Sequence, residues 1–273
     1  MRVRLVNGGL EVELAPDLGG RVALLRHDGR DVLVPMDTEP FDPDFWPKAG
    51  AYPLIPFHNR IIGARLAFGD RVAHLPVHPE SAPHALHGMT SRFAWEIETC
   101  SETAATMRFD WTASSVWPWS FRAWQQFELT GTSFMLTLSI ENRDTVPMPA
   151  GLGWHPYFTG PLDMTEDASR LWPMGADYLP TGQSRNAQPV DAEMKTRYLS
   201  DWRRVAVRWA GGTSMELRAR GLSHLVIHAP DSRYTCIEPV SHLAGLVDHE
   251  IEGMSSLSPD AVRTSQIRLC FGV

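Results

Sequence analysis

The 273-residue sequence contains very little lysine: of its 25 basic residues only Lys48 and Lys195 are lysine, and the other 23 are arginine. Chemistry through a lysine Schiff base therefore has two candidates at most. Cysteine is also scarce, with three widely separated residues and no C-x-x-C pair. This pattern argues against a disulfide framework and against a redox motif, and it predicts a reducing compartment.

Long apolar runs and a basic stripe are missing as well. No apolar run approaches the roughly 18 residues that a membrane-spanning helix needs. The N-terminal segment, residues 1–7, lacks the apolar core of a signal peptide. A net charge of -7, with both signs scattered along the chain, argues against a general nucleic-acid binder. We therefore expect a cytoplasmic protein whose partners are neither nucleic acid nor a membrane.

What the sequence does contain is alternation of apolar and polar residues, which is typical of strands with one buried face. The even positions of Phe134–Glu141 are apolar, for example. Similar runs cover residues 10–14, 21–25, 94–99, 106–111, 121–129, 204–209, 215–219, 224–228 and 266–271, with glycine-containing turn signals between many of them. The best candidate for a helix is the short segment Asp191–Leu199. The sequence thus predicts an all-β fold, a large antiparallel sandwich forming one domain over residues 1–273.

Two long irregular stretches interrupt this pattern, at residues 37–65 and 161–201. Connections of this length in a compact β domain are usually functional. The strand-rich segments are expected to provide the scaffold, and these two stretches are expected to contribute to a site.

Four histidines close together, His74, His78, His84 and His87, raise the question of a metal site. The nearest pair has H-x-x-H spacing, which on a strand directs the two rings to opposite faces. The sequence also lacks an H-E-x-x-H helix and a cysteine partner. We expect no metal site here.

Three other segments carry candidate chemistry. His155 lies in a Gly- and Pro-flanked aromatic run, where it is either a core residue or a rigidly held site residue. Glu238 ends an apolar run and precedes Pro239, so we expect it at a strand end or rim, facing solvent or serving a site. Arg60, in Phe57–Ile61, is either a surface residue or a planar donor for hydroxyl or carboxylate groups.

Taken in order along the chain, these segments resemble the aldose 1-epimerase (mutarotase) family. The resemblance rests on the opening residues 10–22, on Asn59-Arg60-Ile61 for an N-R-I segment, on Leu86-His87-Gly88 for L-H-G, on His155-Pro156-Tyr157-Phe158 for H-x-Y-F, and on Cys236-Ile237-Glu238-Pro239 for the strand with the catalytic glutamate.

This resemblance implies a galactose mutarotase-like β-supersandwich that interconverts the α and β anomers of an aldose. It implies that His155 is the general acid and Glu238 the general base. Arg60 and His87 would hold sugar oxygens with support from Asn59, and Asp201 is the best match for the family's sugar-binding aspartate. No metal or organic cofactor is needed. The expected partner is a small aldose, bound by a monomer or homodimer.

Departures from the family pattern at Met89 and at Thr159-Gly160 leave the aldose open. The segments Trp117-Pro118-Trp119 and 147–151 resemble divergent bacterial members. Three alternatives remain. The chain is a non-catalytic carbohydrate-binding protein on the same fold, a sugar-phosphate mutarotase that uses Arg65 or Arg92, or a glycoside hydrolase, which needs a second carboxylate about 5–10 Å away.

Two expectations concern the details of the site. Reference pKa values predict that Glu238 is ionised at neutral pH unless its site perturbs it, and that His155 is partly protonated. Since sugar C–H faces pack on flat rings, Trp154, Tyr157 and Trp202 are candidate rings beside a sugar, although core packing is the commoner role of tryptophan.

Overall fold

The computed structural model describes residues 1–37, 42–45, 47–245, 254 and 256–272 of the chain. It consists of two large antiparallel sheets and three short two-stranded ones. The described helices are 3-10 turns of three to five residues, as the alternating sequence pattern predicts: η1 (Pro16–Leu18), η2 (Ile62–Ala64), η3 (Pro79–Ser81), η4 (Thr90–Arg92) and η5 (Pro189–Glu193).

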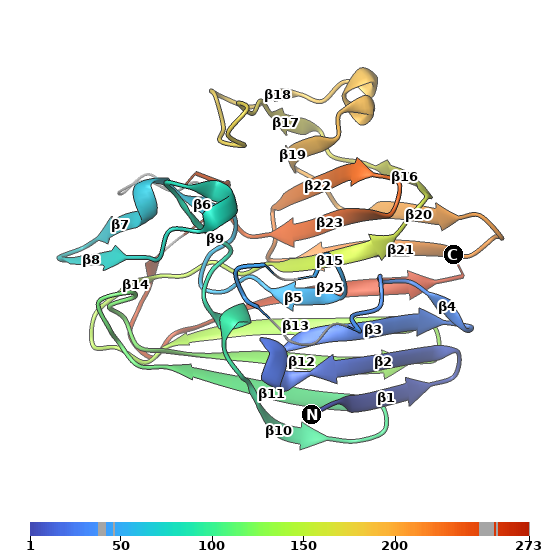
Figure 1. Ribbon diagram of the computed structural model, residues 1–273, viewed down its shortest axis with the longest axis horizontal. Helices are drawn as coiled ribbons and strands as arrows, with labels where there is room; N and C mark the ends of the chain where they lie inside the picture. The colour runs from blue at the N-terminus through green and yellow to red at the C-terminus, as the bar shows by residue number, and fades with distance from the viewer. Residues whose placement is uncertain (38–41, 46, 246–253, 255, 273) are drawn as a thin grey trace.

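The larger sheet contains eleven strands and mixes the beginning, middle and end of the chain (Figure 1). In order across the sheet its strands are β1 (Val3–Asn7), β2 (Leu10–Ala15), β3 (Arg21–His27), β5 (Ala51–Pro53), β15 (Trp154–Thr159), β23 (Tyr234–Val240), β22 (His224–Asp231), β19 (Thr196–Ser200), β17 (Arg170–Trp172) and β18 (Arg185–Asn186), with β4 (Arg30–Asp31) paired to β3.

The second sheet contains eight strands. In order these are β10 (Glu96–Cys100), β11 (Ala104–Trp111), β12 (Phe121–Thr130), β13 (Ser133–Asn142), β25 (Val262–Phe271), β21 (Ser214–Arg220), β20 (Val205–Trp209) and β16 (Leu162–Glu166). The short pairs are β6 (Arg60–Ile61) with β9 (Ala85–Leu86), β7 (Arg65–Phe68) with β8 (Arg71–His74), and β14 (Met148–Pro149) with β24 (Ser256–Leu257).

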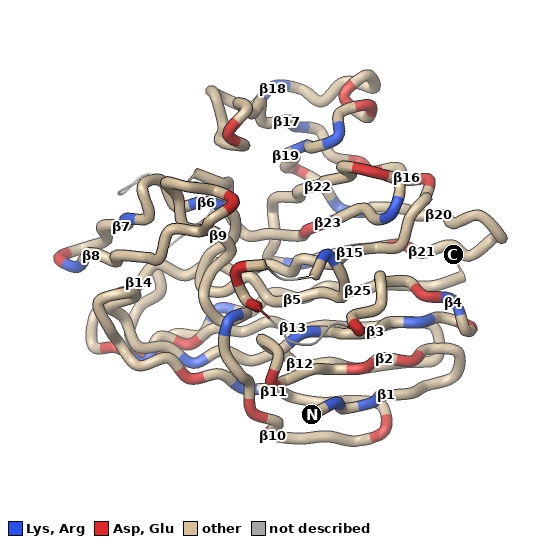
Figure 2. The backbone as a smooth tube through the Cα atoms, in the orientation of Figure 1, with Lys and Arg blue, Asp and Glu red and all other residues tan. Residues whose placement is uncertain are grey.

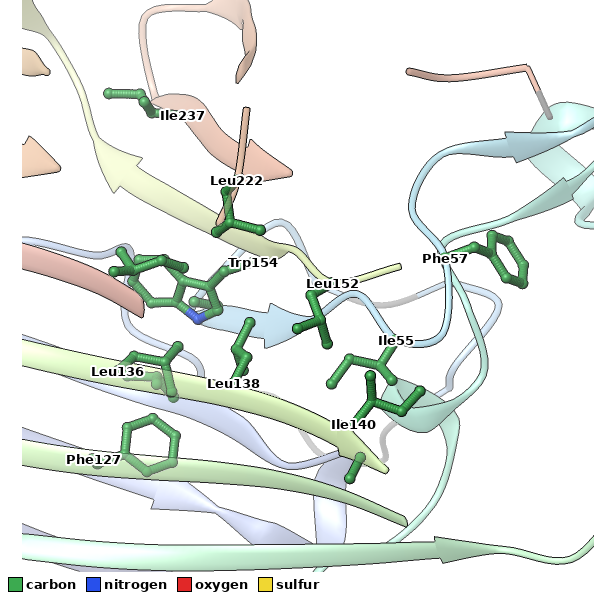
Figure 3. Close-up of a cluster of buried hydrophobic side chains, with 14 of the residues drawn as sticks. Ile55, Phe57, Phe127, Leu136, Leu138, Ile140, Leu152, Trp154, Leu222 and Ile237 are labelled. Atoms are coloured by element: carbon green, nitrogen blue, oxygen red, sulfur yellow. The ribbon is translucent and has the colours of Figure 1, made fainter. Parts of the chain in front are cut away.

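The main hydrophobic core includes residues from both large sheets (Figure 3). Trp154 of β15 is fully buried there, and its ring stacks on Phe134 of β13 with a centroid distance of 5.8 Å. Because successive side chains of a strand point to opposite faces, the next residue, His155, points away from this core. β15 is nevertheless buried on both faces, so its second face must be covered by other parts of the chain.

The runs of alternating residues are all strands in the structure, with ends shifted by a few residues. The predicted helix at Asp191–Leu199 is wrong. Its first residues lie in η5, where the Asp191 carboxylate accepts a hydrogen bond from the backbone N–H of Gln188 at 2.7 Å. Its last residues belong to β19, which pairs with β17 and β22. Pairing on both sides overrides a weak local helix preference.

Basic and acidic residues are interleaved along the strands of both sheets (Figure 2). Arg122 on β12, for example, contacts Asp110 on β11 at 2.6 Å. Opposite charges on neighbouring strands support the pairing modestly. No helix in the described part of the chain is long and apolar enough to span a membrane.

Replacing Trp154 with alanine should destabilise the protein by about 3–5 kcal/mol, because it removes a fully buried ring from the interface between the sheets. Trp124→Ala is the matched control. That ring is partly exposed on the outer side of β12, so its loss should cost about 1 kcal/mol or less. Urea unfolding followed by circular dichroism measures both values, and equal losses would contradict the placement of Trp154 in the shared core.

Candidate active site

A row of side chains crosses the face of the larger sheet that points away from the core. Tyr52 on β5 lies opposite His155 on β15, Glu238 on β23 lies opposite Val226 on β22, and Val226 lies opposite Tyr198 on β19. Directly paired residues of an antiparallel sheet point to the same face. Five strands thus each contribute one side chain to the row, and together they draw on residues from Tyr52 to Glu238.

The centre of this row is the pair His155 and Glu238. Flanking pairs on β15 and β23, Tyr157 with Cys236 and Gly153 with Val240, place these two residues opposite each other. The His155 Nε2 atom lies 3.5 Å from Glu238 Oε1. The exposed fractions are only 6% for His155 and 3% for Glu238, so an imidazole and a carboxyl group face each other out of contact with bulk water.

The expected position of Glu238 at a strand end or rim is wrong. Glu238 lies inside β23 and is buried. Pro239 does not disrupt the ladder, because a proline removes only one hydrogen-bond donor. It still lies opposite Leu225, and pairing continues at Val240 with His224.

Burial changes the proton balance of the pair. It raises the pKa of Glu238 to about 8 and lowers the pKa of His155 well below its usual value. In the described part of the chain, neither Glu238 Oε2 nor His155 Nδ1 has a hydrogen-bond partner. The site therefore perturbs both groups away from their reference ionisation, because desolvation disfavours both charged forms. Burial thus favours a protonated Glu238 beside a neutral His155.

Aromatic rings hold the imidazole of His155 in place. The rings of Tyr52 and Tyr157 lie nearly parallel to it, at centroid distances of 4.7 and 4.8 Å. The ring of His87 meets it edge-on at 5.1 Å. The guanidinium carbon of the buried Arg21 lies 4.3 Å from the centre of the Tyr52 ring. These contacts restrict rotation of the imidazole, which keeps Nε2 directed at Glu238.

The N-R-I and L-H-G segments meet where β6 pairs with β9. The backbone N–H of His87 donates to the carbonyl of Asn59 at 3.0 Å, and the backbone N–H of Asn59 donates to His87 Nδ1 at 3.2 Å. An accepting Nδ1 places the proton of the neutral imidazole on Nε2. Both residues have φ in the left-handed region, +53° for Asn59 and +60° for His87, a strained conformation that is common at functional sites.

Asn59 links this segment to the row across the sheet. Its Oδ1 accepts hydrogen bonds from the backbone N–H of Arg60 at 2.9 Å and from Arg60 Nη1 at 3.2 Å. Its Nδ2 donates to the hydroxyl of Tyr198. The structure therefore brings Asn59, Arg60 and His87 together beside the pair of His155 and Glu238.

Asp201 lies outside this cluster. It is exposed in the turn after β19, where its backbone carbonyl accepts a hydrogen bond from Ser169 at 3.3 Å. Burial lowers the pKa of the nearby His224 to about 4, and the negative charge of Asp201 partly opposes this shift. Tyr198, on β19 itself, lies on the face of the sheet that carries Glu238. Burial together with the charge of Glu238 raises the pKa of the Tyr198 hydroxyl.

Tyr52 and Tyr198 were not among the expected site residues. Four of the five tyrosines in the sequence, Tyr52, Tyr157, Tyr198 and Tyr234, form one buried cluster on this face of the sheet. Of the three candidate rings, Tyr157 belongs to this cluster, whereas Trp154 and Trp202 belong to the main core. The sequence contains only five tyrosines, and this small number could have been used to look for the site. A buried tyrosine hydroxyl needs a polar partner, and polar partners gather at a site.

The candidate metal ligands differ from those that the sequence suggested. His78 and His84 accept hydrogen bonds from the backbone N–H groups of Glu80 and Gly63. Within the described residues, the donor atoms that lie together are those of His155, Cys236 and Glu238, all within 4.8 Å of one another. A bound ion would occupy the lone pairs that acid–base chemistry needs on His155 and Glu238, so the two uses exclude each other. The absence of a metal stays a prediction.

The buried carboxyl of Glu238 should make stability depend on pH. Its pKa is raised from 4.5 to about 8, so the folded state binds more protons than the unfolded state in this range. The stabilisation is complete below the unfolded pKa and is lost as pH rises towards about 8, with a slope of up to about 1.4 kcal/mol per pH unit. Glu238→Gln removes this dependence. Urea unfolding between pH 5 and 9 should show the variant gaining on the wild type as pH rises, and parallel curves would contradict the buried carboxyl.

Comparisons with known proteins identify the family to which the chain belongs. The aldose 1-epimerase family profile matches residues 1–246. The uncharacterized protein YphB of Escherichia coli K12 is 26% identical over a 292-residue alignment that covers 97% of each chain. A galactose mutarotase-like protein from Clostridium acetobutylicum superposes with a TM-score of 0.86 at 21% identity, covering 99% of this chain and 94% of that one. A GalM/aldose epimerase homologue from C. elegans superposes with a TM-score of 0.83 at 15% identity, covering 100% of this chain and 98% of that one. The expected galactose mutarotase-like fold is confirmed, and the chain belongs to the aldose 1-epimerase family.

Proposed function

We propose that the protein is an aldose 1-epimerase that interconverts the α and β anomers of a neutral aldose. The observation that carries this proposal is the separation of 3.5 Å between His155 Nε2 and Glu238 Oε1 in a buried site. The anomeric oxygen O1 and the ring oxygen O5 are bonded to the same carbon. One proton donor and one proton acceptor at this separation can therefore reach one oxygen each.

Ring opening moves two protons. Hydrogen bonds from the sugar to the carboxylate favour the state in which His155 is protonated and Glu238 is ionised, which contains the same number of protons as the state favoured in the empty site. Glu238 then takes the proton from O1 while His155 Nε2–H delivers a proton to O5. The C1–O5 bond breaks and the C1=O1 double bond of the aldehyde forms.

The open chain leaves a protonated Glu238 and a neutral His155, which is the state that burial favours. Rotation about C1–C2 presents the other face of the aldehyde to O5. On closure His155 takes the proton from O5 and Glu238 returns a proton to O1, so the other anomer forms and the enzyme is restored. The site thus stabilises both proton states of the reaction.

The remaining polar groups bind the sugar. With Nδ1 of His87 accepting from the backbone, Nε2–H is its donor. Arg60, held by Asn59 Oδ1, supplies further N–H donors for hydroxyl oxygens. All these residues belong to one chain. Cys100, Cys236 and Cys270 are free thiols, which supports a reducing, cytoplasmic setting.

A sugar-phosphate mutarotase is the second candidate, and the position of Lys48 favours it. The charge of Lys48 contributes to lowering the pKa of both His87 and His155. Lys48 also lies 3.5 Å from Glu80, however, and Arg92 pairs with Asp44 at 2.7 Å. These cations already have acidic neighbours, so we favour a neutral sugar. Exchange measurements on aldoses and on their 6-phosphates distinguish the two substrates.

His155→Ala and Glu238→Ala should each slow anomer interconversion at least about 100-fold, because each removes one of the two proton-transfer groups. Saturation-transfer NMR on aldoses at equilibrium measures the rate, and circular dichroism confirms folding. His84→Ala is the control, since that histidine lies outside the site. Wild-type binding of an aldose without acceleration would identify a non-catalytic binding protein, and unchanged rates in either folded variant would refute the assigned roles.

The pH dependence of the rate should follow the number of protons on the pair. Activity requires one transferable proton, which is lost as pH rises through the pKa of Glu238 near 8. On the acid side a second proton binds only well below pH 6.5, since burial lowers the pKa of His155. Rate measurements from pH 5 to 10 should therefore show a plateau through neutral pH and a decline above about 8. A decline centred near 6.5 would contradict this assignment.

A further inference from the structure

The loop between β17 and β18 is an ordered hairpin. Met174 and Pro180 form a β-bridge. The backbone N–H of Gly175 donates to Leu179 at 2.9 Å, and that of Thr181 donates to Pro173 at 3.0 Å. At the tip, the backbone N–H of Tyr178 donates to Gly175 at 3.0 Å. We name residues 173–181 the β17–β18 hairpin.

This hairpin extends towards the side of the molecule that carries β6 and β9 (Figure 1). Gly245 lies so close to its tip that a Cβ atom there would be 3.2 Å from Leu179 and from Pro180. The backbone N–H of Gly245 in turn donates to the carbonyl of Arg60 at 3.1 Å. The hairpin, the segment after β23 and the N-R-I segment therefore meet beside the site.

Tyr178 is the one tyrosine of the five that is not in the buried cluster. The guanidinium carbon of Arg60 lies 5.1 Å from the centre of its ring. The ring of His228 on β22 meets it edge-on at 6.3 Å. Despite these contacts 41% of Tyr178 is exposed. Its φ of +59° is in the left-handed region, which is costly for a bulky residue and is often found at functional sites.

A short chain of contacts connects this ring to the reacting groups. Arg60 Nη1 donates to Asn59 Oδ1 at 3.2 Å, and Asn59 Nδ2 donates to the hydroxyl of Tyr198. Tyr198 shares its row across the sheet with Glu238. Tyr178 thus contacts the same guanidinium group that Asn59 holds, so an exposed aromatic surface adjoins the donors proposed to bind sugar hydroxyls.

We infer that Tyr178 is a substrate-binding residue whose exposed ring packs against the C–H face of an aldopyranose while Arg60 binds an adjacent hydroxyl group. This inference rests on the proposed function and assigns it a recognition element outside the family motifs. Apolar C–H groups and a flat ring attract each other, and 41% of Tyr178 stays exposed beside its contacts with Arg60 and His228.

The test compares Tyr178→Ala, Tyr178→Phe and Phe93→Ala. Phe93 is the matched control, since 46% of it is exposed and its ring packs on Phe109 and Trp111 near the second sheet. Tyr178→Ala should raise KM about threefold to tenfold with kcat changed less than twofold. Tyr178→Phe should restore KM, because it keeps the ring. An unchanged KM in Tyr178→Ala, or a loss confined to kcat, would overturn the inference.

A double variant separates sugar stacking from mere positioning of Arg60. If the ring contacts the sugar, adding Tyr178→Ala to Arg60→Ala should raise KM further. If the ring acts only through Arg60, the double variant should equal Arg60→Ala, which would overturn the inference. Should the wild type bind an aldose without interconverting its anomers, the proposed function fails. The same comparison is then made on Kd from ligand-observed NMR, where an unchanged Kd in Tyr178→Ala refutes the role of Tyr178.

Discussion

The candidate site depends on placing a carboxyl group beside an imidazole where neither meets bulk water. Glu238 and His155 lie on adjacent strands with their polar atoms 3.5 Å apart, and burial opposes a charge on either. Such burial needs cover on both faces of the larger sheet. The core shared with the second sheet covers one face, and the segments around β6, β9 and the β17–β18 hairpin lie beside the other. The result is a pair in which burial favours the uncharged form of each group.

Aromatic residues divide between these two faces. Tryptophans such as Trp154 pack in the core between the sheets (Figure 3). Tyrosines gather on the other face around His155. The physical reason is that a tyrosine combines an apolar ring with a hydroxyl that can serve polar neighbours such as Asn59. A large apolar ring that is not needed for polar contacts is more stable in the core.

Sequence reasoning identified the strands and selected five residues that the structure brings together, and its failures share a cause. Alternation located β13 because one buried face leaves a period of two. The order of the motifs selected His155, Glu238, Asn59, Arg60 and His87, although their roles remain predictions. Asp201 was chosen by its place in the chain, and it proved exposed, while Tyr198, three residues earlier, lies on the same face of the sheet as Glu238. Which residue of β19 faces the site depends on its register with β22, and local sequence does not encode that register.

The sequence by itself determined an all-β fold and the supply of one histidine, one glutamate and few lysines, because periodicity and composition are local properties. Only the tertiary structure decided that Glu238 is buried within a strand, that its pKa is raised, and that tyrosines rather than tryptophans surround His155. Desolvation and strand register arise from residues far apart in the chain, so they exist only once the sheets have assembled.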